Sequence, residues 1–355
     1  MQRYKFSFDG QNVWLGIDVH LKSWHVTAIT ASGFQCSFVT RPDAQVLIDT
    51  LNKKFPGAHF KAAYEAGFSG FSTYYALTGV GIETIAVNAA DIPTTQKEQL
   101  TKTDAVDSAK IARALKKDQL TAIYIKKAEY MDETNLIRLR SRFVKDLNRN
   151  KVRIKHLLYT QGVKYPERFL LPTSHWSRAF LQWLTDEVKL LSEEKNTLLH
   201  LVAEVKSMKD RIRKINREIV LLSRSDKYKD NYELLKSVPG IGITVAMTFL
   251  TELDNDLLRF SSEKRFVSYI GLVPTCHDSG DKTVSGEMTQ RGHKHLGSML
   301  IEASWKAIAK DTELAACFAR YRMTMPSQKA IVKIARKLAC KLFAVIKNKT
   351  PYVLP

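Results

Sequence analysis

The sequence predicts three successive parts: an α/β N-terminal domain, a central antiparallel coiled coil and a mostly α-helical C-terminal domain. Residues 12–120 alternate β-rich runs with helical patterns, which is typical of a sheet covered by helices. Apolar residues between positions 198 and 222 recur with the spacing of a coiled-coil seam. From residue 231 onward the apolar spacing is mainly helical. The predicted boundaries are therefore 1–122, 123–230 and 231–355.

The composition favours a folded cytoplasmic protein with an anionic partner. The chain has 355 residues, with 55 Lys+Arg against 36 Asp+Glu and a net charge of +19. Its 45% hydrophobic content excludes a disordered basic tail. The four cysteines form no CxxC pair, which argues against a disulfide framework or a zinc ribbon, and we expect no signal peptide or membrane span. Nucleic acid is the first candidate partner, although the charge alone fits any soluble basic protein.

The N-terminal pattern predicts a mixed sheet covered by helices. Three strands in series come first, and strands then alternate with helices. The strands are expected at residues 13–19, 23–30, 34–40, 59–65 and 83–88, and the helices after Pro42, near 69–77 and from about Thr103.

The central part reads as two long helices joined by a reversal. The second helix carries the seam Leu198, Leu201, Val205, Met208, Ile212, Ile215, Ile219 and Leu222. The first, with apolar positions from Leu136 to Leu157, is its expected antiparallel partner. Gly162, Pro166 and Pro172 mark the reversal. We expect this arm to act as a spacer and in oligomerisation. The helical C-terminal domain is expected to contain one irregular region at 274–291.

Four acidic residues in the N-terminal part have placements that favour a shared site. Asp18 and Glu65 end predicted strands, while Asp104 and Asp107 open a predicted helix and share one of its faces. Clustered carboxylates repel one another unless a cation neutralises them, and oxygen ligands select Mg²⁺ or Mn²⁺. Two such metals can assist phosphodiester cleavage. The alternative is that each acid is a solvated surface charge, or in the case of Asp104 a helix N-terminal residue.

Three segments resemble the DEDD motifs of a RuvC-like, RNase H-type domain. They are Leu15-Gly16-Ile17-Asp18-Val19-His20, Tyr64-Glu65-Ala66 and Lys102-Thr103-Asp104-Ala105-Val106-Asp107-Ser108. Their order is similar to that of insertion-sequence transposases that pair this domain with a C-terminal, serine-bearing transposase domain. These enzymes are the bridge-RNA-guided serine recombinases. The resemblance implies that the four acids hold Mg²⁺ or Mn²⁺ and take part in catalysis.

The C-terminal motifs resemble the second domain of the same family. Ser237-Val238-Pro239-Gly240-Ile241-Gly242 lies between two helical stretches, as in a helix-hairpin-helix, whose glycines allow backbone amides to approach a phosphate. Phe266–Pro274, Asp278-Ser279-Gly280 and Thr289–Leu296 follow in the order of that family. By its position in the motif, Ser279 is the expected nucleophile. From the residues alone, a turn residue is the more common interpretation of Ser279, and Ser285 is a rival in the same region.

The resemblance implies a DNA recombinase that forms a covalent 5′-phosphoserine intermediate. Its expected partners are donor and target double-stranded DNA, a structured guide RNA, and further copies of the chain that form a homodimer and then a tetramer. The alternative is a RuvC-type, Mg²⁺-dependent, structure-selective endonuclease with no covalent intermediate. A non-catalytic architectural protein is disfavoured, because clustered acids gain nothing beside phosphates unless they hold cations.

Runs of basic residues supply the expected nucleic-acid contacts. The predicted contacts are Arg138, Arg142, Lys145, Arg149, Arg153, Gly240, Gly242, Lys282, Arg291 and Lys294. A solvated helix face is the alternative for such runs. The histidines His20, His25, His156 and His175 lack the spacing of metal ligands and are predicted to be structural. His293 and His295 could contact phosphate or simply lie on the surface.

Overall fold

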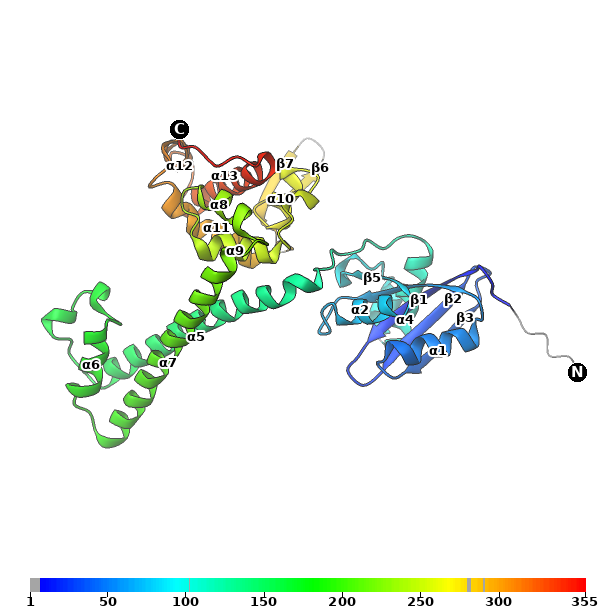
Figure 1. The fold of residues 1–355 in the computed structure, drawn as a ribbon, viewed down its shortest axis with the longest axis horizontal. Coiled ribbons are helices and arrows are strands. Elements are labelled where there is room, and N and C mark those ends of the chain that lie inside the picture. Colours follow the sequence, from blue (N-terminus) through cyan, green and yellow to red (C-terminus); the bar gives the residue numbers. More distant parts are fainter. Residues whose placement is uncertain (1–6, 102, 280–281, 290) are drawn as a thin grey trace, which may run out of the picture. The chain divides into compact units, whose positions relative to one another are not determined.

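The computed structural model divides the chain into two compact units, residues 1–126 and 127–355 (Figure 1). It describes residues 7–101, 103–279, 282–289 and 291–355; the side chains of Lys97 and of residues 275–287 lie outside that description. Among the described residues, no helix is both long enough and apolar enough to cross a bilayer.

The first unit contains the mixed five-stranded sheet that the sequence predicts. Its order is β3-β2-β1-β4-β5, with β1 antiparallel to β2 and parallel to β4. The strands are β1 (Asn12–Val19), β2 (Trp24–Thr30), β3 (Gln35–Thr40), β4 (His59–Glu65) and β5 (Glu83–Val87). The helices are α1 (Ala44–Lys54), α2 (Ser72–Gly79), η1 (Ala89–Asp91), α3 (Gln96–Leu100) and α4 (Asp104–Lys116).

Helices cover both faces of this sheet. Leu15 and Ile17 of β1 pack with Leu47 of α1 and Leu77 of α2 in one buried cluster. Because side chains alternate along a strand, the intervening residues of β1 face the opposite side. That side carries α4, whose Ile111 packs with residues of β4 and β5 in a separate cluster. The result is the three-layer arrangement of an RNase H-like domain.

A glycine allows α4 to approach the centre of the sheet. A Cβ atom added to Gly16 of β1 would lie 2.0 Å from the carbonyl oxygen of Ser108 and 2.4 Å from the backbone nitrogen of Ala112. Any larger residue would therefore push α4 away from β1. Beside this contact, the hydroxyl groups of Thr27 and Ser108 are hydrogen bonded at 2.9 Å. The N-terminus of α4 is consequently held close to the end of β1.

Two long helices begin the second unit. α5 (Met131–Thr160) follows the short η2 (Ala128–Tyr130), and α7 (Ser192–Ser223) runs back along α5 (Figure 1). The Nε of Arg140 donates to the Oδ1 of Asn216 at 2.6 Å, which pairs the start of α5 with the end of α7. The helices are thus antiparallel, and the apolar positions of the predicted seam lie in the buried clusters between them and their neighbours.

The connection between α5 and α7 is more than the simple reversal that we expected. It contains η3 (Glu167–Phe169), η4 (Pro172–Ser174) and the helix α6 (Arg178–Asp186). The aromatic ring of Phe180 stacks on His175 at 4.7 Å and packs against Phe169 at 5.2 Å. Glycine and proline indicated the turns correctly, but this apolar cluster packs on the long helices and orders the segment between them.

The rest of the second unit is largely helical, as predicted, with one exception. Residues 274–291 were expected to be irregular, whereas β6 (Pro274–Ser279) and β7 (Lys282–Met288) pair as an antiparallel hairpin. The Gly, Ser and charged residues of this segment resemble a loop, but ladder hydrogen bonds join backbone groups and tolerate such residues. The helices are α8 (Lys229–Lys236), α9 (Ile243–Glu252), η5 (Leu257–Arg259), α10 (Glu263–Tyr269), α11 (Lys294–Ala307), α12 (Thr312–Arg322) and α13 (Ser327–Asn348).

Candidate active site

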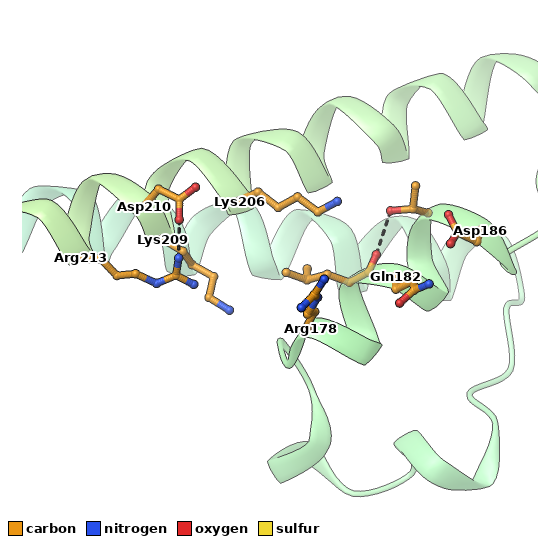
Figure 2. Close-up of a pocket in the computed structure, with 9 residues that line it drawn as sticks. Arg178, Gln182, Asp186, Lys206, Lys209, Asp210 and Arg213 are labelled. Atoms are coloured by element: carbon orange, nitrogen blue, oxygen red, sulfur yellow. Dashed lines mark hydrogen bonds and ion pairs between the residues drawn. The ribbon is translucent and has the colours of Figure 1, made fainter.

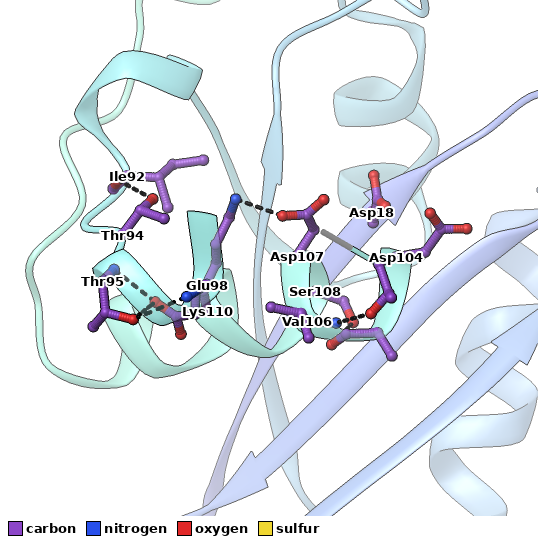
Figure 3. Close-up of polar contacts among 12 residues, drawn as sticks. Asp18, Ile92, Thr94, Thr95, Glu98, Asp104, Val106, Asp107, Ser108 and Lys110 are labelled. Atoms are coloured by element: carbon purple, nitrogen blue, oxygen red, sulfur yellow. Dashed lines mark hydrogen bonds and ion pairs between the residues drawn. The ribbon is translucent and has the colours of Figure 1, made fainter. Parts of the chain in front are cut away.

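The four predicted acids lie at one edge of the first unit. Glu65 is the last residue of β4. Asp18 is near the end of β1, and Asp104 and Asp107 occupy the first turn of α4 (Figure 3). The parallel register pairs Gly16 with Ala63, so the next side chains on the α4 side of these strands are Asp18 and Glu65.

Thr103 defines where α4 begins. Its side-chain oxygen accepts from the backbone N–H of Val106 at 3.3 Å, as an N-cap residue does. In the preceding segment, Glu98 of α3 accepts from the backbone N–H of Thr95 at 2.8 Å and pairs with Arg113 of α4 (Figure 3). These contacts define the first turn of α4 and join the preceding α3 to the last turn of α4.

Two histidines join this acidic group, contrary to the structural role that we predicted. The Nε2 of His20 lies 3.2 Å from Asp18 Oδ2 and 3.5 Å from Asp104 Oδ1. The Nε2 of His25 lies 3.4 Å from the other oxygen of Asp104. His25 is the antiparallel partner of Asp18 on β2. Sequence spacing could not reveal these contacts, because the residues come from a turn, a strand and a helix. Strand register is the signal that could have placed His25.

The charges at this edge are only partly balanced. Lys110 pairs with Asp107 at 2.5 Å, and both side chains are largely buried. Burial raises the pKa of Asp18, the imidazole of His20 lowers it, and the negative charges of Asp104 and Asp107 raise it further, so the net shift is upward. Burial and the two neighbouring carboxylates therefore outweigh the effect of His20 on Asp18.

The ligand types present fit a divalent cation. One ligand atom from each of Asp18, His20 and Asp104 lies within 4.8 Å of the other two. Carboxylate oxygen and imidazole nitrogen are both common metal ligands. A cation here would also offset the negative charges of Asp104 and Asp107, which add to the effect of burial in raising the pKa of Asp18.

The second unit contains the predicted nucleophile. Ser279 is the last residue of β6, and its backbone pairs with that of Lys282, the first residue of β7. The side chains of both residues, and that of Ser285, lie outside the described part of the chain. The structure therefore locates Ser279 at the tip of a hairpin rather than in a loop.

Two glycines hold the base of this hairpin. A Cβ atom added to Gly292 would lie 2.1 Å from the Cα of Gly271, so the two backbones touch. On either side of this contact, the backbone N–H of Thr289 donates to Val273 at 3.1 Å and that of His293 donates to Tyr269 at 2.8 Å. The motifs before and after Ser279 are thus packed against each other.

The predicted glycine turn lies between α8 and α9. Gly240 has a φ of +82°, and an added Cβ would lie 2.4 Å from the carbonyl oxygen of Ala303 in α11. Gly240 is therefore required for packing. Gly242 is the N-cap of α9, and a Cβ there would meet nothing within 4 Å. Phosphate binding by these glycines stays a prediction. The space around Gly242 is more open to a phosphate than the space around Gly240.

The basic residues predicted on α5 are all exposed and recur every three or four positions, so they share one face. Some already have internal partners: Arg149 pairs with Asp146 at 2.9 Å, and Arg153 donates to Asn150 at 2.9 Å. Arg291 and Lys294 are also exposed. Nucleic-acid contact by these residues stays a prediction.

A buried carboxylate links α5 to the motif after the hairpin. Glu252 of α9 accepts two hydrogen bonds of 2.7 Å from Arg138 and lies 3.3 Å from the Nε2 of His293. Burial raises the pKa of Glu252, but these hydrogen bonds and charges outweigh it and lower the pKa to about 2. Arg138, predicted to bind nucleic acid, thus has an internal partner. His293, which we expected to touch phosphate or lie on the surface, instead pairs with a buried acid.

Comparisons with known proteins match two stretches of the chain. Residues 15–161 match a DEDD domain model of IS110-type elements, described as a transposase, and residues 232–319 match a model described as "Transposase IS116/IS110/IS902 family". The chain is 25% identical to a putative transposase y4qE of Sinorhizobium fredii over 304 residues, which covers 84% of this chain and 72% of that protein. It is 24% identical to the transposase for insertion sequence element IS1533 of Leptospira borgpetersenii, covering 96% of this chain and 97% of that protein.

A third relative is the transposase for insertion sequence element IS1111A of Coxiella burnetii, 24% identical over 79% of this chain and 75% of that protein. The DEDD domain implies a divalent metal, in agreement with the ligand types found at the acidic edge.

The two matched models, the order of the motifs and the fold of the first unit lead to one conclusion. The chain belongs to the IS110/IS1111 family of transposases, with an N-terminal DEDD domain and a C-terminal transposase domain.

Proposed function

We propose that this transposase cuts and rejoins DNA through a covalent serine intermediate, with Ser279 as the nucleophile. Asp18, Glu65, Asp104 and Asp107 hold Mg²⁺ or Mn²⁺ at the phosphate under attack. The observation that carries the proposal is the approach of Asp18 of β1 to Asp104 of α4, with Asp107 close enough to raise the pKa of Asp18. Glu65 ends the neighbouring parallel strand β4 at the same edge of the sheet. Pure nucleic-acid binding would gain nothing from such a cluster, because it repels phosphate.

The chemistry exchanges one phosphate ester for another. The Oγ of Ser279 attacks the phosphorus and loses its proton, the bond from phosphorus to the 3′ oxygen breaks, and that oxygen gains a proton. The products are a 5′-phosphoserine and a free 3′-hydroxyl. A bound divalent cation would offset the negative charge that develops on the phosphate. Attack by a different 3′-hydroxyl on the phosphoserine then joins new strands without ATP and regenerates the serine.

The hairpin supports a role for Ser279 as the nucleophile. Its base is held by the glycine contact of Gly271 with Gly292, so the tip is carried on an anchored element. A nucleophile on such a tip can reach a phosphate on the surface of a DNA duplex.

In this proposal the acids and the serine act together in a homodimer, and two dimers form the tetramer that joins two DNAs. Residues 123–230 form the arm that links the protomers, and residues 231–355 form the serine-bearing domain.

The proposed nucleic-acid partners are donor DNA, target DNA and a structured guide RNA. A basic pocket in the arm supports this proposal. It lies between α6 and α7, with a cavity volume of about 540 Å³ (Figure 2). It is lined by Arg178, Leu181, Gln182, Thr185, Asp186, Lys206, Lys209, Asp210 and Arg213.

Positive charge is in excess in and beside this pocket. Asp210 is paired with Arg213 at 2.5 Å, whereas the side chains of Arg178 and Lys206 form no hydrogen bond or ion pair with the described residues. Burial, followed by the charges of Lys209 and Lys155, lowers the pKa of Lys151 next to it. The crowding of these lysines, together with Arg178 and Lys206, favours phosphate binding at this pocket.

A covalent adduct between protein and DNA tests the proposal. The full-length protein is incubated with Mg²⁺, labelled DNA carrying the ends of its element, and RNA transcribed from the flanking non-coding segment. Denaturing gels should show labelled protein for the wild type and for Ser285→Ala, and none for Ser279→Ala or Asp18→Ala. Cut DNA with free ends and no adduct would favour the RuvC-type endonuclease. An adduct that persists in Ser279→Ala would reject this serine.

A further inference from the structure

The imidazole of His20 is placed as a third ligand at the acidic edge. Its Nε2 lies between carboxylate oxygens of Asp18 and Asp104, at 3.2 and 3.5 Å. The backbone N–H of His20 donates to the carbonyl oxygen of Ser23 at 3.2 Å, which fixes the turn between β1 and β2. The backbone of His20 is therefore fixed by a hydrogen bond while its ring lies beside the two acids. About half of the side-chain surface of His20 is exposed.

We propose that His20 binds the divalent cation through Nε2, and that the site therefore prefers Mn²⁺ to Mg²⁺. This inference rests on the proposed function, because it concerns the metal held by the same acids. One ligand atom of each of Asp18, His20 and Asp104 already lies within 4.8 Å of the others, so small side-chain rotations bring all three to one ion. Mg²⁺ favours oxygen ligands and octahedral geometry, whereas a nitrogen ligand favours the transition metal.

His25 has a different part, as a positioning residue. Its Nε2 lies 3.4 Å from Asp104 Oδ2, while His20 approaches Oδ1 of the same carboxylate. When Oδ1 binds the ion, His25 still holds the second oxygen and fixes the orientation of the carboxylate. Outer partners of this kind commonly change metal affinity by roughly 10–100-fold when they are removed. His25 comes from β2 and is about one quarter exposed, so it is held more firmly than His20.

Pulsed electron paramagnetic resonance of bound Mn²⁺ tests both assignments on the full-length protein, independently of activity. Mn²⁺ is titrated into metal-free protein, and nuclear modulation from a coordinated ¹⁴N of imidazole is then recorded. The wild type and His25→Gln should show this modulation, and His20→Asn should lose it. We expect His20→Asn to weaken Mn²⁺ binding by about 10–100-fold and to weaken Mg²⁺ binding less.

The His25 variants separate positioning from ligation. His25→Ala should weaken Mn²⁺ binding while it retains the ¹⁴N modulation, and His25→Gln, whose amide can still donate to Asp104, should restore the affinity. Circular dichroism confirms that each variant is folded. If Mn²⁺ binds without imidazole modulation, or if the modulation survives in His20→Asn, the role of His20 is wrong while the acidic metal site stands. If the wild type binds no Mn²⁺, the proposed function fails as well.

Discussion

Replacing Glu252 by glutamine should destabilise the C-terminal part of the protein by a predictable amount. The side chain is about 2% exposed and accepts two 2.7 Å hydrogen bonds from Arg138. Its pKa is lowered from an ordinary value of 4.5 to about 2. A pKa shift of this size corresponds to a contribution of about 3 kcal/mol to the free energy of unfolding at neutral pH. Glutamine keeps the shape but removes the charge, and leaves Arg138 and His293 without their anion.

The stabilisation by Glu252 should also depend on pH with a defined sign. Because the folded-state pKa lies below the unfolded value, the contribution is complete above pH 4.5 and is lost as the pH falls through about 2. The same relation leaves about 1 kcal/mol of this stabilisation at pH 3. Urea unfolding at pH 7 and pH 3, followed by hydrogen exchange in peptides of α9, measures both values.

A matched control uses an exposed acid of the same unit. Glu233 pairs with Lys236 at 3.5 Å on the surface of α8, so Glu233→Gln should change the free energy of unfolding by less than about 0.5 kcal/mol. If Glu252→Gln unfolds at the same urea concentration as the wild type at pH 7, the buried pair contributes no net stability. A difference that is as large at pH 3 as at pH 7 would show that packing rather than charge is responsible.

Three further experiments test packing and binding. Gly16→Ala should lower the stability of the first unit by about 1–3 kcal/mol, because the new methyl group meets backbone atoms of α4. The control Gly79→Ala places its methyl group where nothing lies within 4 Å, so it should change stability far less. Calorimetry of the two variants measures the difference. Gly292→Ala should abolish the covalent adduct without loss of the acidic metal site, and an active variant would contradict the role of the hairpin base. The double variant Arg178→Ala with Lys206→Ala should weaken the salt dependence of nucleic-acid binding. The slope of the logarithm of the binding constant against the logarithm of the salt concentration should fall in magnitude by about 1–2. An unchanged slope would exclude phosphate contact at the α6–α7 pocket.

Local patterns predicted most of the first unit. Short apolar runs bounded by glycine and proline gave the strands, and the resulting sheet has the predicted mixed character. The positions of Asp18 and Glu65 at strand ends were also predictable, because parallel neighbours end at the same edge of a sheet. Asp104 and Asp107 followed from the helical spacing of the residues after Thr103.

Predictions failed where the decisive contacts join distant segments. His20 and His25 seemed isolated, since their partner Asp104 lies on another element some eighty residues along the chain. The hairpin of β6 and β7 resembled a loop in composition, because backbone pairing leaves little trace in the side chains. α6 was missed because its helical pattern is short and lies among the turn residues of 161–191.

The sequence by itself therefore determined the order of the elements, the mixed sheet, the two long helices and the positions of the four acids at strand ends and at the start of a helix. These features depend on periodicity and residue type within a few turns or strands. Only the tertiary structure decided that two histidines share the acidic edge, that Arg138 has a buried anion as its partner, and that Gly16 and Gly292 permit close backbone contacts. Each of these contacts depends on which distant segments pack together. Residue type and periodicity along the sequence do not specify that packing.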